Sequence, residues 1–180
     1  MKNPKTSIVI TRIKAFAIDY LLILVYVGFL FGATMLVSKL FDIRLDRLNT
    51  ITAEIIGFFT LTLPVILYFT VTEAGSFGGS VGKRKLGLKV VSVKLRRPGF
   101  WQLLARNFVK FLPWEMAHFF VYQLVERSRS GIQPPGWIMA GLIGSQAMAI
   151  IYFLFIVFNK NNRSIYEIAS GTRVVNDSTI

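Results

Sequence analysis

The sequence contains no cysteine and only one histidine among its 180 residues. The lack of cysteine excludes disulfides, thiolate metal sites and a cysteine nucleophile, and a single histidine excludes an imidazole-rich metal centre. Charged residues make up 17% of the chain, whereas soluble chains contain about 25%. Acidic residues are much rarer than basic ones: the chain has nine Asp and Glu but 21 Lys and Arg, which gives a net charge of +12. Apolar residues make up 53%, and this favours the bilayer as the solvent for much of the chain.

Apolar runs long enough to cross a membrane recur along the chain. Residues 15–37, 51–72 and 137–158 each contain 22 residues or more, and a bilayer core of about 30 Å requires about 20 helical residues. Residues 108–125 are a fourth and less apolar run, which either crosses with its polar face turned inward or only dips into the membrane. We predict an all-α membrane protein: a single domain built as a four-helix transmembrane bundle.

The placement of the basic residues predicts the orientation of these helices. Four basic residues and no acid precede the first span, and nine basic residues and no acid lie between residues 74 and 114. By the positive-inside rule, both segments face the cytoplasm. Four spans would place sixteen basic residues inside and five outside, so we expect both termini to be cytoplasmic.

The segment of residues 74–107 is predicted to hold structure of its own on the cytoplasmic side. Residues 88–95 partly alternate and are β-branched, which predicts a short strand that could pair with residues 172–175. Residues 100–112 place Gln102, Arg106 and Lys110 at four-residue spacing. This pattern predicts an amphipathic helix that lies on anionic lipid headgroups.

Asp19 is an acidic residue inside the first span. Arg12 lies seven residues earlier on the same helix face, but about 10 Å away along the axis, which is too far for a direct pair within this helix. Asp19 therefore needs a partner from another helix, because a bare carboxylate is costly within the membrane. Two interpretations remain open: a structural ion pair or hydrogen bond between helices, and a site that binds a proton or a cation.

Glu115 and His118 form a Glu-x-x-His pair on one helix face. Carboxylate-bridged di-metal bundles use this spacing twice, with further glutamates from other helices. The chain has a single histidine, so the second copy cannot exist and we expect no metal site. A hydrogen-bonded polar face and a proton relay remain as interpretations.

The remaining motifs weigh against catalysis and nucleic-acid binding. A phosphate-binding loop around Gly82-Lys83 would need glycine and Ser or Thr where the chain has Phe77 and Arg84. The sequence shows no recognisable pair of a nucleophile and a general base. We therefore expect that the protein is not an enzyme and has no catalytic residues and no cofactor. The basic residues lie between membrane spans, so we expect them to contact anionic lipid headgroups rather than nucleic acid.

Gly28 and Gly32 permit close helix approach, either within the monomer or in a homo-oligomer.

Three blocks of the sequence carry a family resemblance. They are Arg12-x-x-Ala15-Phe16-x-x-Asp19, residues 78–91 with Gly78, Ser80, Gly82, Lys83 and Gly87, and residues 163–175 with Arg163 and Glu167. These blocks resemble the RDD family of bacterial membrane proteins, named for one arginine and two aspartates. The family's second aspartate falls on Glu167, which keeps the carboxylate but adds a methylene.

The resemblance implies the inner membrane of a bacterium, and some members of the family have been linked to sodium–proton antiport. We therefore expect a membrane protein that transports ions by cation or proton exchange through intramembrane carboxylates. The alternative is a non-transporting scaffold that binds anionic lipid and other membrane proteins. The residues expected on the ion pathway or in a buried ion pair are Arg12, Asp19, Glu115, His118, Arg163 and Glu167.

Overall fold

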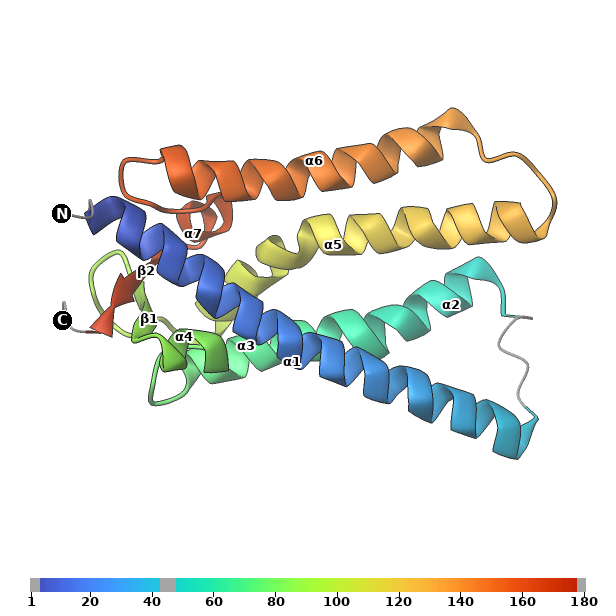
Figure 1. Ribbon diagram of the computed structural model, residues 1–180, viewed down its shortest axis with the longest axis horizontal. Helices are drawn as coiled ribbons and strands as arrows, with labels where there is room; N and C mark the ends of the chain where they lie inside the picture. Colours follow the sequence, from blue (N-terminus) through green and yellow to red (C-terminus); the bar gives the residue numbers. More distant parts are fainter. Residues whose placement is uncertain (1–3, 43–47, 178–180) are drawn as a thin grey trace.

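The computed structural model describes residues 4–42 and 48–177, which fold into long helices with a small sheet at one end. The first long helix is α1, Pro4–Phe41. The chain returns through three consecutive helical segments that form one continuous helix: α2 (Thr50–Gly57), the π-helical turn η2 (Phe58–Thr62) and α3 (Leu63–Ala74). Two further long helices, α5 (Phe100–Arg129) and α6 (Gly136–Phe158), pack side by side (Figure 1).

The short elements gather at one end of the bundle, where both described ends of the chain also lie (Figure 1). We call this the sheet end. Its elements are α4 (Val81–Lys85), β1 (Leu88–Ser92), α7 (Ile165–Ala169) and β2 (Thr172–Asn176). The connection between α5 and α6 lies at the opposite end.

Among the residues that the structure describes, three helices are long and apolar enough to cross a membrane, namely Ile8–Phe41, Thr50–Ala74 and Gly136–Phe158. The predicted spans 15–37, 51–72 and 137–158 lie within them. The predicted fourth span, 108–125, lies within α5, which does not meet the same criterion of length and composition. The fold is therefore mostly helical, with three candidate membrane-spanning helices, and the expected count of four is not confirmed.

The helix predicted for residues 100–112 is present, but it does not end there and its polar face does not turn outward. These residues are the first part of α5, which continues without interruption to Arg129. Arg106 is only 1% exposed, and Lys110 points into the interior rather than toward headgroups. The polar face turns inward because buried carboxylates from other helices lie opposite it.

The predicted pairing of the two short strands is confirmed. Strands β1 and β2 are antiparallel, with register from Leu88 opposite Asn176 to Ser92 opposite Thr172. Leu88 and Val90 of β1 and Val174 of β2 turn to one side, where they pack with residues of α1 and α5. The two paired strands thus close the sheet end over a small apolar core.

Helix α1 is fixed to the rest of the molecule by a close approach to α4. A methyl group built on Gly82 would lie 2.1 Å from the carbonyl oxygen of Ala15, so only glycine fits there. Further along α1, Tyr26 donates a hydrogen bond of 2.6 Å to the carbonyl of Thr60 in η2. Proline at position 64 cannot donate to that carbonyl within the helix, so the Tyr26 hydroxyl satisfies it.

Candidate functional site

Three carboxylates are buried together near the sheet end, although they come from distant parts of the chain. Asp19 lies on α1, Glu73 on α3 and Glu167 on α7, and none is more than 2% exposed. A buried carboxylate is tolerated only when it is paired or hydrogen-bonded. The partners of each therefore define what the site can do.

Glu73 is neutralised by two cations. Its carboxylate accepts from Arg106 Nη1 at 2.8 Å and from Lys83 Nζ at 2.5 Å, and Asn107 Nδ2 donates at 3.2 Å. Burial lowers the pKa of the Lys83 ammonium, while the Glu73 carboxylate opposes that shift. Glu73 thus joins the end of α3 to both α4 and α5.

Glu167 is held by two arginines and by its own helix start. Arg12 forms an ion pair with it, and Arg106 Nη2 donates to it at 3.2 Å. The backbone N–H of Ser164 donates to the same carboxylate at 3.0 Å, in a capping box that begins α7. Burial alone would raise the pKa of Glu167, but the two guanidinium groups outweigh burial and hold the pKa below its ordinary value. Arg106 is therefore shared between two carboxylates.

Asp19 differs from the other two carboxylates because its partners are neutral. Its oxygens accept from Ser80 Oγ at 2.6 Å, from the backbone N–H of Gly82 at 2.8 Å and from the Tyr68 hydroxyl at 3.0 Å. Within residues 4–42 and 48–177, no lysine or arginine forms an ion pair with it. Asp19 thus fixes α4 to α1 through hydrogen bonds alone.

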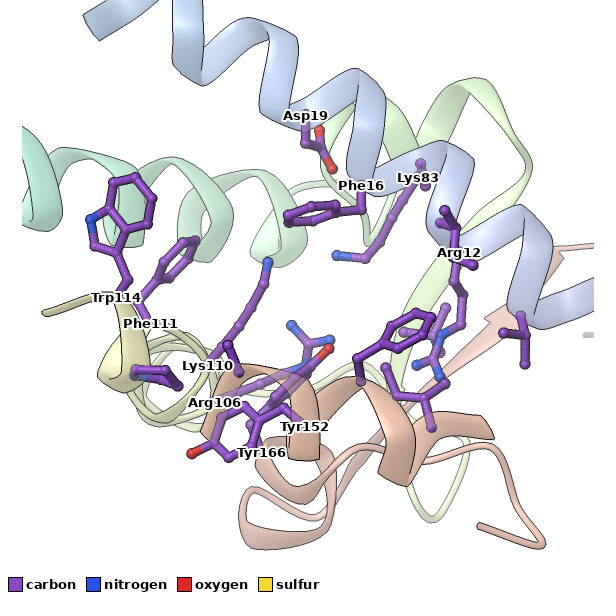
Figure 2. Close-up of a pocket in the computed structure, with 18 of the residues that line it drawn as sticks. Arg12, Phe16, Asp19, Lys83, Arg106, Lys110, Phe111, Trp114, Tyr152 and Tyr166 are labelled. Atoms are coloured by element: carbon purple, nitrogen blue, oxygen red, sulfur yellow. The ribbon is translucent and has the colours of Figure 1, made fainter. Parts of the chain in front are cut away.

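A cavity of about 610 Å³ lies between α1, α5 and α6 beside these groups. Figure 2 shows the ammonium ends of Lys83 and Lys110 pointing toward one another inside it, with the guanidinium of Arg106 close by. Asp19 and Arg12 border the same cavity from α1. The rest of the wall is largely apolar or aromatic and includes Phe16, Phe111, Trp114, Tyr152, Phe153 and Ile156.

Glu115 and His118 contact one another but lie apart from the three buried carboxylates. Their side chains are 3.8 Å apart, and Glu115 accepts from Thr62 Oγ1 at 2.5 Å. His118 borders the large cavity, whereas Glu115 borders a smaller pocket of about 360 Å³ that also contains Glu54. Among the residues that the structure describes, no group of three or more His, Cys, Asp or Glu side chains could hold a metal ion.

The remaining residues singled out from the sequence serve the site indirectly. Arg163 donates to the carbonyls of Glu167 at 2.8 Å and Thr172 at 3.1 Å, so it joins α7 to β2. Gly78 and Gly87 have φ of +66° and +65°, which favours glycine. Ser80, Gly82 and Lys83 each contact one of the buried carboxylates.

Sequence reasoning did not find Glu73, Arg106 or Lys110 as members of the site. A signal was available, since Glu73 is the only acid between Glu54 and Glu115 and stands beside nine basic residues. The ion pair between Glu73 and Arg106 could not be predicted from the sequence, because Arg106 lies 33 residues away on a helix that was expected at the membrane surface.

Apolar helices of membrane-spanning length that enclose a buried charge cluster define a helical membrane protein. A family model described as the RDD family matches residues 7–176, and the chain belongs to this family of membrane proteins. Comparison with curated proteins and with solved structures gives no significant match.

Proposed function

We propose that the protein transports ions across the membrane, with Asp19 as the group that takes up and releases the ion. The observation that carries this proposal is the contrast among the three buried carboxylates. Glu73 and Glu167 are neutralised by ammonium or guanidinium groups, whereas Asp19 borders the cavity and is held by neutral donors. Only Asp19 can therefore change its charge without leaving a buried cation unpaired.

The partners of Asp19 suit such a change. Two of its three donors, Ser80 and Tyr68, are hydroxyl groups, which can either donate or accept a hydrogen bond. When Asp19 is ionised, both hydroxyls donate to it. When it is protonated, the carboxyl group donates to one of them, and the remaining bond from Gly82 N–H is kept.

The charges around the cavity favour a proton over sodium as the exchanged ion. Arg12, Lys83, Arg106 and Lys110 all border the cavity and lower the local concentration of free cations. A proton can instead pass between hydrogen-bonding groups. His118 borders this cavity and contacts Glu115, which borders the second pocket, so this pair supports a relay further along α5.

We place the protein in the bacterial inner membrane with the sheet end in the cytoplasm. Both described ends of the chain lie at the sheet end (Figure 1), and the nine basic residues between 74 and 114 belong to it or to the first part of α5. The positive-inside rule supports this orientation.

Proton flux in proteoliposomes tests the transport proposal. Asp19→Asn keeps one oxygen that accepts from Gly82 N–H, and its amide N–H can donate to the Ser80 hydroxyl, but it cannot take up a proton. We therefore expect wild-type protein to carry flux and Asp19→Asn to carry none. Asp42→Asn is the matched control, since Asp42 is an exposed acid at the far end of α1. Equal flux in wild type and Asp19→Asn would remove Asp19 from the pathway. An absence of flux in wild type would contradict transport.

A non-transporting scaffold that binds anionic lipid is the second candidate. The observation that favours it is the set of four cationic side chains around one cavity. In that case Asp19→Asn would lower folded yield, and no form of the protein would carry flux.

A further inference from the structure

The charges around the cavity do not balance. Four cationic side chains, Arg12, Lys83, Arg106 and Lys110, line it, against three carboxylates beside it, Asp19, Glu73 and Glu167. The first three cations form ion pairs with Glu73 or Glu167. Within the part of the chain that the structure describes, Lys110 forms no ion pair and contacts aromatic rings instead. Its Nζ lies 3.4 Å from the centroid of Phe69 and 4.9 Å from that of Phe111.

Arg106, which lines the same cavity, also has one donor without a partner. Its Nη atoms bind Glu73 and Glu167, but its buried Nε has no hydrogen-bond partner. A buried donor without a partner costs free energy comparable to a lost hydrogen bond, and more when it is charged. The unpaired ammonium of Lys110, beside the other cationic side chains on the same cavity wall, indicates that an anion belongs there.

The rest of the wall indicates what the anion carries. Phe16 of α1 and Phe153 of α6 both line the cavity and are still 54% and 44% exposed, so the cavity opens between two membrane-spanning helices. A molecule that enters here comes from the bilayer. The volume of the cavity, about 610 Å³, lies within the range of ligand-binding pockets.

We infer that this cavity binds an anionic membrane lipid, with the phosphate of the headgroup at Lys110, Lys83 and Arg106 and an acyl chain along the aromatic wall. The phosphate supplies the counter-charge that Lys110 lacks, and it can accept from the ammonium groups of Lys110 and Lys83 inside the cavity. The acyl chain covers Phe16, Phe111 and Trp114 where the helices leave the cavity open. The inference goes beyond the proposed transport and does not require Asp19 to exchange ions; it deepens the lipid binding of the second candidate, on which it rests, by naming the cavity and the groups that hold the lipid.

Binding to the purified full chain in a non-ionic detergent tests the inference. Dioleoylphosphatidylglycerol is the probe, dioleoylphosphatidylcholine tests the need for net charge, and inorganic phosphate tests the need for the acyl chains. We expect dioleoylphosphatidylglycerol to raise the midpoint temperature of thermal unfolding and to form a one-to-one complex with the protein that native mass spectrometry detects. The other two should bind at least about tenfold more weakly.

Lys110→Met is the decisive variant, because it keeps an apolar contact with Phe69 and removes the charge. We expect at least about a tenfold loss of affinity for dioleoylphosphatidylglycerol, and no loss of stability in lipid-free detergent, since a surplus buried charge is removed. Lys94→Met removes the same charge from the exposed turn after β1 and should bind like wild type.

Three results would overturn the inference. One is equal binding of the two phospholipids, and another is equal binding of inorganic phosphate and dioleoylphosphatidylglycerol. The third is unchanged affinity in Lys110→Met. Because these measurements need no ion gradient, they can succeed where the flux assay fails, and the reverse also holds.

Discussion

Arg12 of α1 and Glu167 of α7 form an ion pair across 155 residues of sequence. The pair joins the first helix to the last one before β2. Arg106 of α5 contacts the same carboxylate, so three helices meet at a single side chain. The site is therefore assembled from the whole length of the chain.

Removing the charge of Glu167 should destabilise the protein. Glu167→Gln leaves Arg12 and Arg106 with less compensation in a buried place, and we expect the free energy of unfolding to fall by about 3 kcal/mol. Glu167→Asp keeps the charge with a shorter reach and should give an intermediate value. Denaturation by SDS in mixed micelles measures both. Glu126→Gln, an exposed site, should change stability by less than about 0.5 kcal/mol.

The lowered pKa of Glu167 predicts a pH dependence of stability. The folded pKa lies below the unfolded value of about 4.3, so the contribution of Glu167 is present above that value. It is lost as the pH falls through the lower, folded pKa. Wild type should therefore lose more stability than Glu167→Gln when the pH drops from about 5 to about 3. Parallel curves for the two proteins would contradict this, and Glu126→Gln should follow wild type.

Gly82 should not accept any side chain. A methyl group there would lie 2.1 Å from the carbonyl oxygen of Ala15 and 3.0 Å from the Asp19 carboxyl carbon. Gly82→Ala should push α4 away from α1, break the hydrogen bonds to Asp19 and lower stability by about 2 kcal/mol or more. Gly99→Ala is the matched control, since nothing lies within 4 Å of a methyl group at that position. Folded yield after size-exclusion chromatography compares the two.

The lack of native cysteine allows a direct test of orientation. Lys94→Cys places one thiol at the sheet end, and Gln133→Cys places one in the connection between α5 and α6; both sites are exposed. A membrane-impermeant maleimide should label Gln133→Cys in spheroplasts and Lys94→Cys only after the membrane is opened. The opposite pattern would place the sheet end outside and reverse the proposed topology.

The sequence was sufficient for the features that depend on local pattern. Run length located the three apolar helices, and alternation with β-branched residues located the two strands that pair. The Glu115–His118 contact follows from a spacing of three on one helix. These features need no knowledge of how the helices are arranged.

The charge cluster could not be predicted in the same way. The spacing of Gln102, Arg106 and Lys110 defines a polar face, but the same spacing suits a face toward headgroups and a face toward buried acids. The choice depends on Glu73 and Glu167, which reach Arg106 from α3 and α7. In the same way, the neutral partners of Asp19 lie on α3 and at the start of α4, about 50 to 60 residues away.

The position of Glu167 has a consequence for biosynthesis. When the ribosome has made α1 and α5, the guanidinium of Arg12 has no carboxylate, and Arg106 has only Glu73. Both acquire their shared partner only after residue 167 has been synthesised and α7 has docked. The buried charge cluster can therefore close only after synthesis has passed α7, so α1 and α5 settle into their final arrangement later than their own positions in the chain suggest.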